Sequence, residues 1–190
     1  MSNTTWDRLV YGDEIQRVKR EKSVPYVTKT IFASSLEDEQ SDGWELLSEM
    51  KNPKKVKVKK DKPQDEIFED TVWVLLANLG FTTMNRDQHF KMSYGNSPSQ
   101  TQQIDVFAVD DETILFVECK SAVKLTDGVF KTVIEAYSEK MKGLRAEATQ
   151  HFPNRKCKFI FATNNYILSH NDEERLKASD IIYFNERRVR

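Results

Sequence analysis

The sequence lacks the marks of several protein classes. Its 190 residues include only two cysteines, Cys119 and Cys157, and neither lies in a CxxC pair, which argues against a structural zinc site. We interpret both as reduced, buried thiols of a cytoplasmic protein. No apolar run approaches the roughly 18 residues of a membrane span, and the first residues do not resemble a signal peptide. The sequence therefore predicts a cytoplasmic protein with no membrane partner.

An excess of charge of either sign is also missing. The formal net charge is −1, so overall charge gives no indication of a nucleic-acid partner, and any such indication must be local. Charged residues make up 31% and hydrophobic residues 38%, which is polar for a globular protein but not typical of disorder. The length fits one domain with a smaller appendage. We predict a β-rich extension over residues 1–62 and a main domain over residues 63–190.

The stretch 103–121 (QIDVFAVDDETILFVECKS) predicts two apolar strands and a tight turn over residues 110–113. Within the strands themselves lie three charged residues, Asp105, Glu118 and Lys120. Side chains alternate along a strand, so Glu118 and Lys120 share one face and Cys119 takes the other. If Asp105 pairs onto the face of Glu118 and Lys120, two carboxylates and an ammonium converge. Close carboxylates repel unless a cation neutralises them, and few hard oxygen ligands favour Mg²⁺. The alternative is a structural ion pair, which contributes little net stability.

Apolar periodicity predicts the elements around this hairpin. The helix upstream of it carries Glu66, Glu69 and Asp70 in its first turns, where acidic residues also complement the helix dipole. The strand–helix–strand order downstream implies parallel crossovers. We predict helices over residues 65–80, 126–150 and 171–178, and strands over residues 158–163 and 181–184.

The extension has a local excess of lysine. We expect an antiparallel meander of strands over residues 24–33, from Gly43, and over 54–60, with a short helix around Leu36–Ser41; residues 1–23 form a short helix or a loosely ordered leader. The stretch Lys51–Lys62 contains seven lysines. They fit either a strip that contacts phosphates or a solvated edge strand that lysines protect from aggregation. The candidate nucleic-acid-binding residues are Lys54, Lys55, Lys57, Lys59 and Lys60.

The order of these elements resembles the PD-(D/E)xK nuclease superfamily, and within it Mrr-type restriction endonucleases and archaeal Holliday-junction resolvases. Four segments carry the resemblance: IFEDTVWVLLANLGF with Glu69, QIDVFAV with Asp105, FVECKS with Glu118 and Lys120, and KFIFATNN followed by DIIYFN. Ile104 stands where the family motif has proline. The resemblance implies an α/β restriction-endonuclease-like core, a mixed central sheet flanked by helices in the order αβββαβαβ.

The resemblance also implies an activity, Mg²⁺-dependent hydrolysis of DNA phosphodiester bonds in a prokaryotic restriction, phage-defence or DNA-repair setting, with Mn²⁺ able to substitute. Asp105, Glu118 and the backbone carbonyl of Cys119 would hold the metal, and Glu69 would bind it through water or complete a second site. Lys120 would orient the attacking water or stabilise developing charge, and Gln103 would position a phosphate or water. The expected partners are DNA, branched or modified DNA included, and a second copy of the chain. The alternative is a catalytically silent module that binds nucleic acid or a protein partner.

Overall fold

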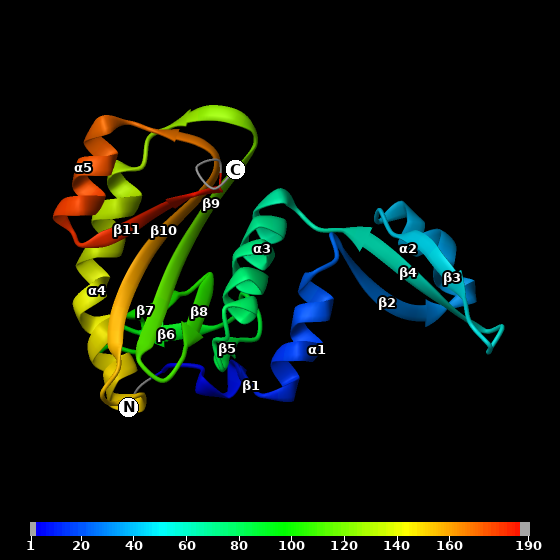
Figure 1. Cartoon of the computed structure of the whole chain (residues 1–190). Helices are drawn as coiled ribbons and strands as arrows, with labels where there is room; N and C mark the ends of the chain where they lie inside the picture. The colour runs from blue at the N-terminus through cyan, green and yellow to red at the C-terminus, as the bar shows by residue number, and fades with distance from the viewer. Residues whose placement is uncertain (1–2, 187–190) are drawn as a thin grey trace.

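The computed structural model describes residues 3–186. A six-stranded mixed sheet has helices on both faces, and a three-stranded sheet stands to one side of it (Figure 1). The main sheet has the spatial order β1 (Leu9–Tyr11), β5 (Thr83–Asn85), β8 (Val106–Val109), β9 (Thr113–Gly128), β10 (Lys156–Leu168) and β11 (Ile181–Asn185). Strands β1 to β9 pair antiparallel, and β9, β10 and β11 pair parallel. This confirms the predicted fold class.

The helices divide between the two faces of this sheet (Figure 1). One face packs against α1 (Asp13–Lys22) and α3 (Gln64–Asn78), and the other against α4 (Lys131–His151) and α5 (His170–Ala178). From α3 onward the order is α3, β5, β8, β9, α4, β10, α5, β11, which is the predicted αβββαβαβ. A two-stranded ribbon of β6 (Lys91–Ser93) and β7 (Thr101–Gln103) is inserted between β5 and β8. None of the helices within residues 3–186 is long and apolar enough to cross a membrane.

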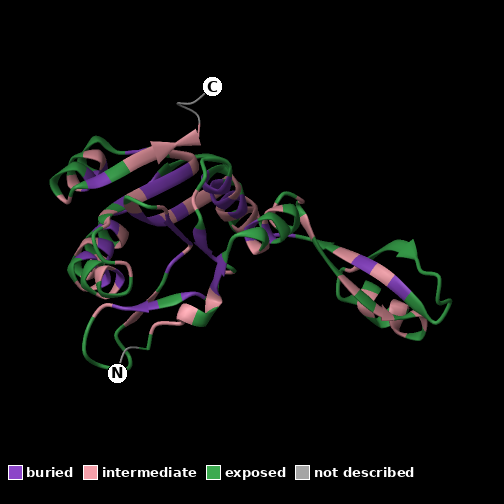
Figure 2. Ribbon diagram, turned by 60° about the horizontal axis from the view of Figure 1, so that its bottom comes forward, coloured by how far each residue is buried: buried purple, intermediate pink, exposed green. Residues whose placement is uncertain are grey.

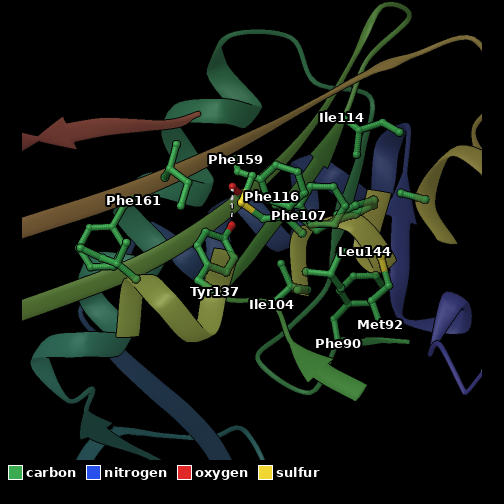
Figure 3. Packing of buried hydrophobic residues seen from close by; sticks show 14 of the residues in the cluster. Phe90, Met92, Ile104, Phe107, Ile114, Phe116, Tyr137, Leu144, Phe159 and Phe161 are labelled. Carbon is green, nitrogen blue, oxygen red and sulfur yellow. Dashed lines mark hydrogen bonds between the residues drawn. The ribbon is translucent and has the colours of Figure 1, made fainter. Parts of the chain in front are cut away.

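Two apolar layers hold the helices to the sheet. On the α4 side, Phe116 and Phe159 stack with ring centroids 4.7 Å apart, and the hydroxyl of Tyr137 donates a hydrogen bond to the carbonyl of Phe116 at 3.1 Å (Figure 3). On the α3 side, Val117 packs in a second buried cluster with Trp73. Adjacent residues of β9 thus serve opposite layers, as the two-residue period of a strand requires.

The three-stranded sheet has the order β2 (Tyr26–Phe32), β4 (Lys55–Asp61), β3 (Glu45–Glu49), with all pairs antiparallel. The 3-10 turn η2 (Ala33–Ser35) and the helix α2 (Leu36–Ser41) connect β2 to β3. The predicted meander and its short helix are therefore present. Because β4 is the central strand, the interpretation of its lysines as protection of a sheet edge is wrong.

Two predicted helices differ from the structure. For residues 1–23 the sequence predicts a short helix or a leader. The structure instead has the 3-10 turn η1 (Trp6–Arg8), then Leu9 and Val10 in β1, which pairs with β5, and a helix only from Asp13. The structure thus groups β1 and α1 with the main sheet, and the small sheet occupies residues 26–61. The predicted helix start near residue 126 is wrong because β9 keeps pairing with β10 up to Gly128.

A buried ion cluster joins the small sheet to the main domain. Asp70 on α3 contacts the ammonium of Lys22 through Oδ1 at 2.5 Å and that of Lys62, just after β4, through Oδ2 at 2.7 Å. The Lys62 ammonium also donates to the carbonyl of Glu21 at 3.1 Å. Both Asp70 and Lys62 are buried. We call Asp70, Lys22 and Lys62 the junction cluster.

Candidate active site

Asp105 lies at the mouth of the β8–β9 hairpin. Val106 pairs with Val117, so one residue further Asp105 lies across from Glu118. Its carboxylate Oδ2 accepts a hydrogen bond from the backbone N–H of Cys119 at 2.8 Å. This contact fixes the aspartate against the strand that carries the Glu-x-Lys sequence, as the sequence predicts.

Asn85, at the end of β5, clamps the backbone on both sides of Asp105. Its Nδ2 donates to the carbonyl of Asp105 at 3.0 Å, and its Oδ1 accepts from the N–H of Phe107 at 2.9 Å. Asn85 is almost fully buried, and its own carbonyl accepts from the indole N–H of Trp73 at 2.7 Å. Sequence reasoning missed this positioning residue. The signal in the sequence is that Asn85 is a polar residue at the end of a short apolar strand.

Glu118 and Lys120 share one face of β9, as predicted, and Cys119 is buried toward the other. Lys120 Nζ lies 2.8 Å from Glu118 Oε1, with the glutamate side chain 13% exposed and the lysine side chain 33% exposed. Burial lowers the pKa of Lys120, but the charge and hydrogen bond of Glu118 outweigh it and hold the pKa above its ordinary value. Lys120 is therefore an ammonium in this arrangement.

The carboxylates around the hairpin mouth have little positive charge to balance them. Burial, and then the charge of Glu118, raise the pKa of Asp105 to about 7. Burial, and then the charge of Asp105, raise the pKa of Glu69 to about 7. The pKa of the Cys119 thiol lies well above its ordinary value because of burial and then the carboxylates of Asp105, Glu69 and Glu118. The helix residue Glu69 therefore does approach the hairpin, and the cluster is one that a cation would stabilise.

The chemistry of these donors fits a divalent cation. Asp105, Glu118, Glu69 and the carbonyl of Cys119 offer the hard oxygen ligands that Mg²⁺ takes in proteins. Across residues 3–186, however, no three acidic, histidine or cysteine side chains are already arranged as a set of ligands. In this arrangement Glu118 contacts Lys120, and Asp105 Oδ2 accepts the hydrogen bond of the Cys119 N–H. The metal-binding residues thus stay a prediction.

A cavity of about 310 Å³ opens beside Glu118 and Lys120 and is also lined by Tyr137, Lys140 and Gln102. The ammonium of Lys140 on α4 donates to Gln102 Oε1 at 2.6 Å. Gln103, the residue that the sequence favoured for this place, is exposed. Because side chains alternate along β7, its neighbour lines the cavity instead. Sequence reasoning missed Gln102, and it left Lys140 as either solvated or facing DNA without assigning it to this site.

Four of the five candidate lysines lie on β4 and Lys54 directly precedes it. Strand β4 stands apart from β8 and β9 (Figure 1). Lys55, Lys57 and Lys59 share one face of β4. Lys60 lies on the opposite face, where its ammonium donates to the carbonyl of Asp42 at 2.7 Å. Lys54 is exposed in the turn before β4. The predicted strip is therefore three lysines on one face.

Comparison with known proteins places no family name on the chain. No protein-family model matches the sequence, and no curated protein matches it. Similar solved structures include a protein of unknown function (20% identity over 60% of this chain and 54% of that chain, TM-score 0.44). Others are Can2 from Sulfobacillus thermosulfidooxidans, in complex with cyclic tetra-adenylate (14%, 90% and 47%, TM-score 0.41), and a repair endonuclease from Pyrococcus abyssi (12%, 83% and 64%, TM-score 0.36).

The chain spans about half the length of the protein of unknown function and of Can2. Similarity at these TM-scores carries no argument about activity. The assignment of a restriction-endonuclease-like α/β fold rests instead on the chain's own strand order, its two parallel crossovers and the position of the hairpin between α3 and α4.

Proposed function

We propose that the chain is a metal-dependent endonuclease of the PD-(D/E)xK type that hydrolyses phosphodiester bonds of DNA. The observation that carries this proposal is the convergence of Asp105, Glu118 and Lys120 at one hairpin mouth, with Glu69 approaching from α3. A Mrr-type or resolvase-like enzyme, acting in restriction, phage defence or DNA repair, is the form we propose. We also propose that it acts as a homodimer, since enzymes of this class cut two strands by pairing.

In this proposal Asp105, Glu118 and the Cys119 carbonyl hold Mg²⁺, for which Mn²⁺ can substitute, and Glu69 contacts it through water. The metal supplies polarisation of a phosphoryl oxygen and a lower pKa for a bound water. The chain's own contribution is position: Asn85 and the Cys119 N–H hold Asp105 at a fixed place on the sheet. Such a preorganised carboxylate loses little freedom when its ligand arrives.

Lys120 would stabilise negative charge in this reaction and would not act as the base. As an ammonium beside Glu118, it has no free lone pair with which to accept a proton. A fixed ammonium near the scissile phosphate stabilises the negative charge that develops on the phosphoryl oxygens. Lys140 and Gln102, which line the same cavity, are placed to position the phosphate from the α4 side.

The alternative proposal is a catalytically silent module that binds nucleic acid or a protein partner. The closed pair between Glu118 and Lys120 favours it, because a structural ion pair would look the same. The pKa of about 7 for both Asp105 and Glu69 speaks against it. Buried carboxylates that lack a balancing cation contribute no stability, so a module without a ligand there has no physical reason to keep them.

A cleavage assay decides between these proposals. Supercoiled plasmid and a branched DNA are incubated with the chain in Mg²⁺, in Mn²⁺ and in EDTA. We expect metal-dependent cleavage that Lys120→Ala reduces by about a hundredfold or more, the usual loss when one donor to the transition state is removed. Lys124→Ala, which removes an exposed lysine of the same strand, is the control and should leave cleavage unchanged.

Equal trace cleavage by the wild-type chain and Lys120→Ala would refute the endonuclease. DNA binding that persists in Asp105→Asn, with no cleavage by either form, would establish the silent module. Calorimetric titration with Mn²⁺ tests the metal independently of turnover. Binding that is lost in Asp105→Asn supports the metal site, and equal binding by both forms contradicts it.

A further inference from the structure

The small sheet has two chemically different faces. Lys55, Lys57 and Lys59 of β4 project to one side, and Val56 and Val58 project to the other. The register with β2 adds side chains to the lysine side, because directly paired residues of antiparallel strands share a face. The pairs on this side are Phe32 with Lys55, Thr30 with Lys57, Thr28 with Lys59 and Tyr26 with Asp61. We call this set of residues the lysine face.

Helix α2 and the residues around it cover the opposite face. There Lys29 of β2 pairs with Glu39 of α2 at 2.5 Å and lies over the ring of Trp44, 4.2 Å from its centroid. Val58 is fully buried beneath this cover, and Val56 is 8% exposed. The small sheet thus has its own core on that side, and its core does not use the lysine face.

The lysine face is open. Thr28 and Thr30 are exposed, and the ring of Phe32 is 62% exposed. Figure 2 shows the small sheet extending away from the main domain, which leaves most of this face without a neighbour. The exposed Phe32 ends β2 beside Lys55 and has no packing role on this face. Large aromatic side chains are otherwise typical of cores and binding surfaces.

Charge and aromatic rings alternate on this face. The ammonium of Lys55 lies 5.9 Å from the ring centroid of Phe32, and that of Lys59 lies 5.8 Å from the centroid of Tyr26. Lys59 also pairs with Glu45 of β3 at 3.0 Å, an exposed contact. Within the described part of the chain, neither Lys55 nor Lys57 forms an ion pair. The face therefore presents positive charge that is only partly neutralised.

We propose that the lysine face binds single-stranded nucleic acid. Its lysines would contact phosphates, and the rings of Phe32 and Tyr26 would stack on bases. Stacking requires unpaired bases, because a duplex hides their faces and offers a flat sheet only its phosphates. The six residue steps from Tyr26 to Phe32 span about 20 Å, which is room for several nucleotides. The inference rests on the proposed function only in taking nucleic acid as the ligand, and it requires no cleavage.

The lysine face is continuous with a cavity that reaches the main domain. Tyr26 and Thr28 line this cavity of about 490 Å³ together with Lys62, Arg86 and Glu66. Glu66 lies one helical turn before Glu69 on α3. A strand bound on the lysine face would therefore continue toward the helix that contributes to the candidate active site.

Fluorescence anisotropy with the full chain tests the inference. The probes are a labelled 20-nucleotide oligo(dT), the matching oligo(U) and a 20-base-pair duplex, all in EDTA so that no cleavage occurs. We expect tighter binding to a single strand than to the duplex. Lys55→Gln with Lys57→Gln should weaken it about tenfold or more, and should reduce the slope of log affinity against log salt by about 1.4. Phe32→Leu should weaken it by at least fivefold through lost stacking.

The controls remove the same groups elsewhere. Lys156→Gln with Lys177→Gln takes two charges from exposed lysines of the main domain, and Tyr11→Leu removes an exposed ring of the same domain. Losses equal to those of the face variants would overturn the inference, as would tighter binding to the duplex or no binding to any probe. Single-strand binding without cleavage in Mg²⁺ would keep this inference and refute the endonuclease. Cleavage in Mg²⁺, together with single-strand binding that the face variants leave unchanged, would refute this inference and keep the endonuclease.

Discussion

Glu69 and Asp70 are neighbours on α3, yet they belong to two regions with different electrostatics. Asp70 enters the junction cluster, where two lysine ammoniums lie within 2.7 Å of its oxygens. Glu69 faces the candidate active site, where burial and the charge of Asp105 raise its pKa to about 7. Asp105 itself also has a pKa of about 7. One turn of helix thus presents a balanced carboxylate to one region and an unbalanced one to the other.

This difference in charge balance is the one we expect between a structural ion cluster and a site that binds a cation. A buried carboxylate needs hydrogen-bonded cations, and the junction cluster supplies them from α1 and from the residue after β4. At the hairpin mouth Lys120 pairs with Glu118, yet the pKa values of Asp105 and Glu69 stay raised to about 7. A charge deficit of this kind is the expected condition of a site that awaits a cation.

The largest effect should come from breaking the junction cluster. Asp70→Ala leaves two ammoniums without their partner, one of them on a lysine that is almost fully buried. Removing one member of a buried ion pair costs about 3–5 kcal/mol of unfolding free energy. Urea denaturation measures this loss. Asp65→Ala removes an exposed acid of the same helix and should change stability little. A loss below about 1 kcal/mol for Asp70→Ala would show that the junction adds no stability.

The stability linked to the carboxylates of the candidate active site should fall as pH rises. An acid paired with a cation shows the opposite dependence. The pKa values of Asp105 and Glu69 are raised to about 7 in the folded chain. The stability linked to them is therefore fully present below about pH 4 and is lost as pH rises to about 7. We expect the unfolding free energy to fall by roughly 3–4 kcal/mol between pH 5 and pH 8 on their account. Asp105 accounts for most of this fall, because solvent contact moderates the share of Glu69.

The measurement compares the wild-type chain with Glu69→Gln and Asp105→Asn combined, by urea denaturation at several pH values. The variant lacks both titrating groups, so its stability should vary less with pH, and it should exceed the wild-type chain at pH 8. Residues far from Asp105 and Glu69 titrate equally in both proteins and cancel in the difference. Parallel pH profiles would contradict the raised pKa values and, with them, the charge deficit.

Local patterns in the sequence predicted the parts of this contrast that depend on strand and helix periods. Glu118 and Lys120 share a face because the period of a strand is two, and this needs no tertiary information. The element order from α3 to β11 follows in the same way from periods of two and 3.6. Asp105 could be assigned to the same mouth because a tight turn leaves few registers for a hairpin.

The remainder depends on contacts between distant segments. From the sequence, Lys62 belongs to a charged turn and Asp70 complements a helix dipole. Only the folded chain brings them together with Lys22 of α1 in one ion cluster. Asn85 gains its role only when β5 pairs beside β8. The choice between Gln102 and Gln103 depends on where β7 begins, and a shift of one residue reverses the side that faces the cavity. Periodicity contains none of this information.

The smallest effect should come from an ion pair that is neither buried nor short of partners. Glu14 on α1 contacts Arg17 at 2.6 Å and Arg86 at 2.8 Å, and both arginine side chains are largely exposed. Water already solvates these groups, so Glu14→Gln should lower the unfolding free energy by between about 0 and 1 kcal/mol. This loss should be smaller still at high salt, which screens the ion pair. Urea denaturation at low and high salt measures both quantities. A loss as large as that of Asp70→Ala would mean that contact geometry alone sets the value of an ion pair here. A small loss would assign the difference between α3's two carboxylates to burial and to the balance of charge around them.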